Sequence, residues 1–218
     1  LSELGGGKRG FLAIHASQTI ASYWLPPFLA RFHAAFPLID VRLTLGNTES
    51  VTGATQEGAA DIGFVEGSVQ VPSLSIAKVA TDRLILVTRP DHAWSRSGKL
   101  TWDRLFEGNW ILREQGSGTR SVFEDAIRAS GYDPARLNVA LELPSNEAIC
   151  SAVRSGHYVT AISELVAAPH LIAGALVKAD FALPQRQFLM LMHNDRYKTK
   201  AIEMLSRYIM EDRVDFHY

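Results

Sequence analysis

The chain has 218 residues, of which 47% are hydrophobic and 21% are charged, and its formal net charge is −1. This composition is ordinary for a soluble globular protein, and the length suits two small domains. A nucleic-acid-binding surface normally carries a basic stripe, and the sequence contains no long run of Lys or Arg. No apolar run approaches the roughly 20 residues that a transmembrane helix needs. The composition therefore argues against a membrane span and against direct contact with DNA.

The first residues, LSELGGGKRGFLAIHA, do not follow the pattern of a secretory signal peptide. A single cysteine, Cys150, excludes an internal disulfide framework. Both features favour a cytoplasmic location. The opening LSELGGGKRG looks like the end of another segment followed by a glycine linker, so we expect a further module to precede Leu1 in the natural protein.

Apolar strand patterns of about five residues alternate with polar clusters that start helices. In chain order the expected strands are GFLAIHA (10–16), DVRLTL (40–45), ADIGFV (60–65), DRLILVTRP (82–90), NWILRE (109–114), LNVALEL (137–143), YVTAI (158–162) and QFLMLMH (187–193). The expected helices follow within 20–36, from 48 to about 58, from 118 or 119 to 130, and over 148–155, 164–169 and 198–211.

Strands that alternate with helices predict parallel α/β sheets. The strand at 83–88 separates two sets of these units, and the strand at 187–193 is followed only by a closing helix. This pattern predicts two Rossmann-like subdomains joined by two crossover strands. Subdomain I would comprise residues 8–87 and 188–218, and subdomain II residues 88–187, with residues 1–7 as the end of the preceding linker.

The stretch REQGSGTRSVFEDAI, residues 113–127, contains two glycines and several hydroxyl residues before a helix pattern. Ser121 and Glu124 fit a capping box, but that start leaves the glycines unexplained. A helix that starts at Gly118 or Thr119 uses them better. Successive N–H groups in such a turn form a concave anion site, and the helix start adds partial positive charge. Arg120 disfavours the helix start, and a bound anion would explain its presence; a capped turn with Arg120 in solvent remains the alternative.

Other polar clusters occupy the same place in their own strand-helix units: 17–19, 48–50, 145–147 and Ser163. Each is most simply an N-cap. Together they predict several hydroxyls and helix starts around one cleft between two domains, where small molecules commonly bind. Glu66 and Glu114 also lie at strand ends. An acid there repels an anion unless it pairs with Arg113 or Arg120, or unless the ligand also carries a cation.

Signals for an enzyme or a metal site are weak. The seven histidines show no ligand spacing, and no cysteine pairs with them, so no metal and no cofactor are expected. Cys150 lies among apolar residues of a helix and is expected to be a buried structural thiol. His15, Glu66 and Glu114 are the eligible acid-base groups, and His15 is more simply a packed or solvated histidine.

The ordered set of motifs resembles the effector-binding domain of LysR-type transcriptional regulators, which has the type 2 periplasmic-binding-protein fold. The resemblance rests on G-x-L-x-I-x-A-S-Q-T-I-A-x-Y-x-L-P at 10–26, F-x-x-x-F-P at 32–37, GAADIGFVEG at 58–67, LILVTRPDHAW at 84–94 and ELPSNEAICSAVRSGHYVTAIS at 142–163. It spans roughly residues 8–212. EQGSGTR-x-x-FE is similar to a branch that contains sensors of sulfur oxyanions. GHYVTAIS departs from the family pattern, which more often has a second glycine there.

The resemblance implies a cytoplasmic regulator whose DNA contacts come only from an N-terminal winged helix-turn-helix module. It implies a homodimer through subdomain I, a tetramer in the full-length protein, and a small effector, an oxyanion or a carboxylate, in the cleft. Carried over by position, the effector-binding residues are Ser17, Gln18, Thr19, Glu66, Gly116, Ser117, Gly118, Thr119, Arg120, Ser145, Asn146 and Ser163. Arg120 would either contact the anion or pair with Glu66 or Glu114.

Two other functions fit the same fold. A free-standing solute-binding protein of a transporter would share the cleft but would need an export signal. An enzyme such as a dehydratase or deaminase would need an acid-base group or a cofactor there. The sequence names neither the effector nor the target genes.

Overall fold

The computed structural model describes residues 10–211, so the predicted linker end at residues 1–7 lies outside the described residues. The chain divides into two units. Unit 1 contains the chain up to Ala80 and again from Gln187, and unit 2 contains Thr81–Arg186. The chain therefore passes between the units twice, first in one long strand and later in another. The sequence-based boundaries, 87/88 and 187/188, fall in the same two strands.

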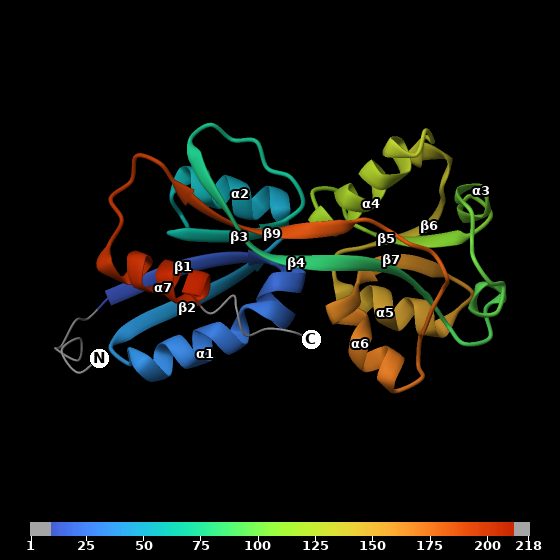
Figure 1. Cartoon of the computed structure of the whole chain (residues 1–218), viewed down its shortest axis with the longest axis horizontal. Helices are drawn as coiled ribbons and strands as arrows, with labels where there is room; N and C mark the ends of the chain where they lie inside the picture. Colours follow the sequence, from blue (N-terminus) through green and yellow to red (C-terminus); the bar gives the residue numbers. More distant parts are fainter. Residues whose placement is uncertain (1–9, 212–218) are drawn as a thin grey trace. The chain divides into compact units, whose positions relative to one another are not determined.

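Unit 1 contains the part of the sheet that starts at β2, and helices lie on both of its faces. Its strand order is β2-β1-β3-β9; β1 runs parallel to β2 and β3, and β3 pairs antiparallel with β9. In Figure 1, α1 and α7 lie on one face of this sheet and α2 on the other. The elements are β1 (Gly10–Ser17), a π-helical turn (Ile20–Trp24), α1 (Pro26–Ala35), β2 (Ile39–Gly46), α2 (Thr48–Glu57), β3 (Ile62–Glu66), β9 (Gln185–His193) and α7 (Lys200–Glu211).

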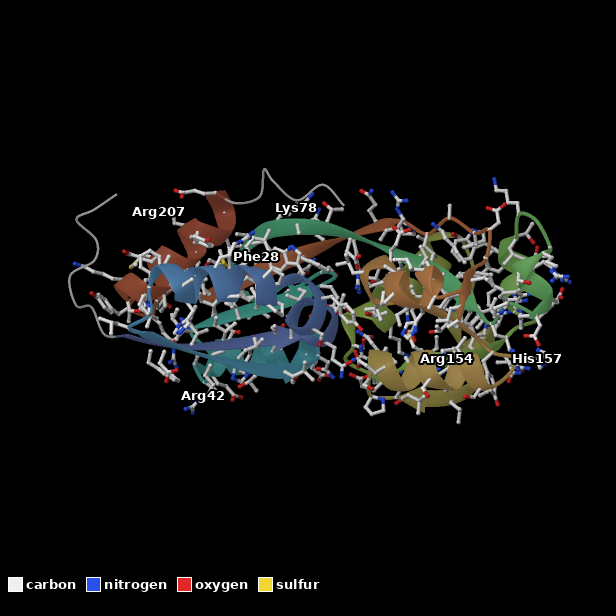
Figure 2. All side chains as sticks on the ribbon, turned by 90° about the horizontal axis from the view of Figure 1, so that it is seen from below. Phe28, Arg42, Lys78, Arg154, His157 and Arg207 are labelled. Atoms are coloured by element: carbon white, nitrogen blue, oxygen red, sulfur yellow. The ribbon has the colours of Figure 1, made fainter. Side chains whose placement is uncertain are left out.

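Aromatic side chains form much of the unit 1 core. Phe28, on α1 and labelled in Figure 2, packs on Trp24 with 4.8 Å between the ring centroids. Trp24 also contacts Phe64 of β3 and Phe188 of β9. Pro26 and Pro27 occupy the first turn of α1, where their missing N–H groups cost no helical hydrogen bond.

Unit 2 repeats this arrangement. Its strand order is β4-β7-β5-β6; β5 runs parallel to β6 and β7, and β4 pairs antiparallel with β7 and β8. In Figure 1, α4 covers one face of the sheet and α5 and α6 the other. The elements are β4 (Leu74–Thr88), α3 (Trp102–Leu105), β5 (Asn109–Arg113), α4 (Gly118–Ala129), β6 (Asn138–Leu143), α5 (Asn146–Ser155), β7 (Val159–Ser163), α6 (Glu164–Ile172) and β8 (Val177–Lys178), with 3₁₀ turns at Ala93–Ser95 and Pro134–Arg136.

Trp110 lies at the centre of the unit 2 core. It is fully buried, its ring packs 4.8 Å from that of Phe123 on α4, and its indole N–H donates to the carbonyl of Leu105 at 2.7 Å. The hydrogen bond satisfies the one polar group that burial of the indole removes from water. The contact with Phe123 fixes α4 on the sheet and so places the start of α4 at the end of β5.

The expected strands and main helices are all present, but two features differ from the sequence prediction. The strand predicted from Asp82 begins at Leu74, and the sheets are mixed because β4 and β9 pair antiparallel with their neighbours. The short elements at 93–95, 102–105, 134–136 and 177–178 were not predicted, since segments of two to four residues show no periodicity. No helix within residues 10–211 has the length and apolar character of a bilayer span.

Candidate ligand-binding residues at the strand ends

The loop after β5 turns sharply into α4. Gly116 has a φ of 81°, a left-handed conformation that favours glycine, and Ser117 is the N-cap residue before the first helical residue, Gly118. The predicted helix start at Gly118 or Thr119 is therefore confirmed. The alternative capping box at Ser121 is wrong, because Ser121 lies within the first turn and its N–H donates to the carbonyl of Ser117 at 3.0 Å.

Ser117 does not cap α4 with its side chain. Its residue exposure is 2%, and its Oγ finds no hydrogen-bond partner within residues 10–211. A buried hydroxyl without a partner costs free energy, so its retention calls for an explanation such as a ligand. It lies at the start of a 12-residue helix, where backbone N–H groups lack intrahelical acceptors.

Arg120 is held by protein groups. Its Nε donates to Glu124 of α4 at 2.7 Å, and its Nη1 donates to Glu142 of β6 and to the carbonyl oxygen of Arg113. Burial alone lowers the pKa of Arg120, but the hydrogen bonds and charges of both carboxylates outweigh it, so the pKa lies above its ordinary value. The predicted pairing with Glu66 or Glu114 is thus replaced by Glu124 and Glu142, which lie closer on the same helix and the neighbouring edge strand.

Arg113 binds Glu114, the acid that directly follows β5. Its Nε and Nη2 donate to the carboxylate of Glu114 at 2.8 and 2.9 Å, and its Nη1 donates to Asn146 Oδ1 at 2.8 Å. Arg113 is 3% exposed and Asn146 is fully buried. The guanidinium therefore ties the end of β5 to the start of α5. Glu114 pairs with Arg113, one of the two arginines that the sequence proposed for it.

A second buried network joins α4 to α6. Arg186 Nε donates to Asp82 Oδ2 at 2.7 Å, and its Nη1 donates to Thr119 Oγ1 at 2.9 Å. The other oxygen of Asp82 accepts from Ser163 Oγ at 2.9 Å, and Ser163 in turn caps α6 by accepting from the N–H of Leu165. Two predicted site residues, Thr119 and Ser163, are thereby connected through two residues that the sequence did not predict.

The remaining predicted residues of unit 2 have local roles. Ser145 Oγ accepts from the N–H of Ala148 at 3.0 Å and so caps α5. Cys150 is a buried free thiol on α5, and burial raises its pKa to about 11. The prediction of a buried thiol is confirmed, and its raised pKa keeps it in the unreactive protonated form.

Unit 1 carries the other predicted residues. Ser17 at the end of β1 donates a short hydrogen bond to the carboxylate of Glu66 at the end of β3, and both residues are 1% exposed. Thr48, the first residue of α2, donates to the carbonyl oxygen of Glu66 at 3.1 Å. Gln18 and Thr19 directly follow β1 and lead into the π-helical turn. The end of β1, the end of β3 and the start of α2 are therefore in contact within unit 1.

The predicted residues fall into two sets. Ser17, Gln18, Thr19 and Glu66 belong to unit 1, and Gly116 to Arg120, Ser145, Asn146 and Ser163 belong to unit 2. The sequence analysis missed Asp82 and Arg186. Little in the sequence points to these two residues, since each is a charged residue near the start of an apolar strand. Their opposite charges suggest an ion pair only once the two strands are known to be neighbours. Within residues 10–211 no group of three or more His, Cys, Asp or Glu side chains could hold a metal ion.

Known proteins place this chain in a family. The model of the LysR substrate binding domain matches residues 5–213. The HTH-type transcriptional regulator YeiE of Escherichia coli (strain K12) is 31% identical over 210 residues, which cover 95% of this chain and 70% of YeiE. The chain therefore belongs to the LysR substrate binding domain family, the ligand-binding part of LysR-type transcriptional regulators.

Solved structures share the fold. The regulatory domain of CcmR from Synechocystis, in complex with 2-PG, has a TM-score of 0.85 at 24% identity, covering 95% of this chain and 99% of that one. The effector-binding domain of QuiR, in complex with shikimate, has a TM-score of 0.85 at 11% identity, covering 97% and 100%. The fold is the type 2 periplasmic-binding-protein-like fold of LysR effector-binding domains, as the sequence predicted.

Proposed function

We propose that this chain is the effector-sensing domain of a LysR-type transcriptional regulator and that a small oxyanion or carboxylate binds at the start of α4. The observation that carries the proposal is the buried hydroxyl of Ser117, which has no partner within residues 10–211 and stands at a helix N-terminus. Helix starts bind anions because their N–H groups and dipole favour negative charge. The ligands 2-PG and shikimate of CcmR and QuiR are compatible with this chemistry.

The charges around α4 define the kind of anion site. Arg113, Arg120 and Arg186 each contact at least one carboxylate at hydrogen-bond distance. Their positive charges are already compensated within the protein. A ligand would therefore be recognised mainly by neutral donors, namely hydroxyls and backbone N–H groups, which suits a small, strongly accepting anion. Direct contact between Arg120 and the effector stays a prediction, and the three protein partners of Arg120 supply another reason for its presence.

Binding of a small anion is testable with inorganic sulfate, inorganic phosphate, 2-PG and shikimate. A ligand that binds the native state raises the midpoint of thermal unfolding by mass action. Ser117→Ala should weaken the tightest of these ligands by about 0.5–1.5 kcal/mol, or roughly twofold to tenfold, as measured by calorimetry.

Ser121→Ala is the matched control for Ser117→Ala. Ser121 lies on the same turn of α4, is exposed, and its hydroxyl already donates to the carbonyl of Gly118 at 3.2 Å. This variant should bind with unchanged affinity. No stabilisation by any of the four anions, or equal affinity of the two serine variants, would contradict an anion site at α4.

The assembly of the full-length regulator is also part of the proposal. We infer a homodimer through subdomain I, a tetramer of the full-length protein, DNA binding only through an N-terminal module, a cytoplasmic location and no catalytic activity. The relatives support this, since they are HTH-type transcriptional regulators, and this chain corresponds to 70% of YeiE. Light scattering of the full-length protein with and without operator DNA measures the assembly directly, and a stable monomer would contradict it.

A further inference from the structure

A buried ion pair links the two strands by which the chain passes between its units. Asp82 lies on β4, two residues beyond the boundary at Ala80, and Arg186 on β9 is the last residue of unit 2. Their side chains are 2% and 1% exposed and approach to 2.7 Å. The two residues are 104 positions apart in the sequence, so the pair joins the first passage of the chain to the second.

Stability alone does not explain this pair. Removing two charges from water costs about as much as their attraction returns, and apolar residues of similar size often serve as well. Each of the two charged residues also hydrogen-bonds to a third residue. The Arg186 guanidinium also binds Thr119 in the first turn of α4, and the Asp82 carboxylate also binds Ser163 at the start of α6. One chain of hydrogen bonds thus runs from α4 through both connecting strands to α6.

The hydroxyl proton of Ser163 makes this chain sensitive to a ligand. A serine has one proton to donate, and Ser163 donates it to Asp82 while its oxygen accepts from the N–H of Leu165. A ligand oxygen that takes this proton removes one hydrogen bond from Asp82. An anion beside Thr119 likewise competes with Asp82 for the charge of Arg186. Occupancy of the site and the geometry of the ion pair are therefore energetically linked, and such a linkage acts in both directions.

We propose that the Asp82–Arg186 pair is a positioning element that transmits ligand binding at Thr119 and Ser163 into strands β4 and β9. This inference rests on the proposed effector site at the start of α4. Thr119 and Ser163 meet the ligand, whereas Asp82 and Arg186 act through them. The pair makes the hydrogen bonding of the two connecting strands depend on whether the site is occupied.

Hydrogen exchange of the backbone amides tests this role, with inorganic sulfate and shikimate as the two probes. In the wild-type protein, ligand should slow exchange in the first turn of α4, which it contacts. It should speed exchange in residues 82–88 of β4 and 185–189 of β9, because it takes hydrogen bonds from the pair that joins these strands. In the double variant Asp82→Leu/Arg186→Met, which replaces both charges by apolar groups of similar size, the slowing in α4 should persist and the faster exchange in β4 and β9 should be lost.

Two single variants sharpen the result. Arg186→Lys keeps a charge for Asp82, but an ammonium lacks the planar fork that serves Asp82 and Thr119 together. It should retain the faster exchange in β4 and lose it in β9, and it replaces the double variant if that protein does not fold. Arg83→Gln, an exposed neighbour of Asp82 on β4, is the control and should behave as the wild type.

Each outcome separates the two proposals. Faster exchange in β4 and β9 that survives in a folded pair variant would overturn the role of the ion pair and leave the effector site intact. An effect of ligand confined to α4 in the wild type would do the same. No slowing in α4 with either probe would overturn the effector site, and the transmission role with it. Loss of the faster exchange in β4 and β9 with retained slowing in α4 supports both.

Discussion

The two units supply different hydrogen-bond donors to their acidic side chains. In unit 1 the buried Glu66 carboxylate accepts a short hydrogen bond from the hydroxyl of Ser17. In unit 2 the acids Asp82 and Glu114 pair with arginines. A serine hydroxyl is thus one donor to Glu66, whereas guanidinium groups donate to Asp82 and Glu114. The comparison teaches that a similar strand arrangement does not determine which side chain donates to an acid.

The largest expected effect comes from breaking the ion pair of unit 2. Arg186→Ala leaves the Asp82 carboxylate buried without its cation and should lower the free energy of unfolding by about 3–5 kcal/mol. Urea denaturation followed by Trp fluorescence measures this. Arg83→Ala, exposed on the same strand, should stay within about 0.5 kcal/mol of the wild type. Equal effects of the two variants would show that the Asp82–Arg186 pair does not stabilise the native state.

A matched serine pair compares the two units directly. Ser17 and Ser117 are both buried, but the Ser17 hydroxyl donates to a carboxylate and the Ser117 hydroxyl has no partner within residues 10–211. Ser17→Ala should cost about 1–3 kcal/mol of stability, because Glu66 loses a donor in a buried place. Ser117→Ala should cost close to nothing without ligand. Chemical denaturation of both variants decides the point, and the reverse order would refute the contrast.

A smaller effect is expected at Arg120, whose partners differ in exposure. The side chain of Arg120 is 12% exposed, that of Glu124 16% and that of Glu142 48%. Arg120→Gln should lower stability by about 1–2 kcal/mol, since it removes two ionic hydrogen bonds and one to a carbonyl. Glu142→Gln should cost about 0–1 kcal/mol because water screens that contact. Thermal unfolding of both variants tests the order, and a larger loss for Glu142→Gln would contradict it.

The smallest expected effect concerns the titration of His92 in unit 2. Burial first, and the charge of His157 second, lower the pKa of His92 below 6.5, and Asp91 opposes them. The unfolded chain therefore binds the proton at a higher pH than the native state, so this group reduces stability as pH falls from 6.5 to the native pKa and no further.

His157→Gln removes one cause of the lowered His92 pKa. The drop in unfolding free energy between about pH 7.5 and about pH 5.5 should become smaller in this variant than in the wild type. Denaturation at both pH values measures the difference. An equal or steeper drop in His157→Gln would mean that His157 does not influence His92.

Much of the fold could be predicted from the sequence because its signals are local. The strand patterns and the start of α4 at Gly118 follow from periodicity and from backbone preferences. The first part of β4 was missed, since Leu74–Ala80 alternates polar and apolar residues without a strong apolar run. The antiparallel pairing of β9 with β3 and of β4 with β7 was missed because it depends on partners distant in the sequence.

The candidate site shows the same division. The sequence by itself determined the family motifs, the polar strand ends and the hydroxyl-rich start of α4, since each depends on neighbouring residues. Only the tertiary structure decided that Arg120 binds Glu124 and Glu142, that Arg113 binds Glu114, and that Asp82 and Arg186 meet. The physical reason is that a buried charge must find a partner in space, and sequence distance does not record which strands become neighbours.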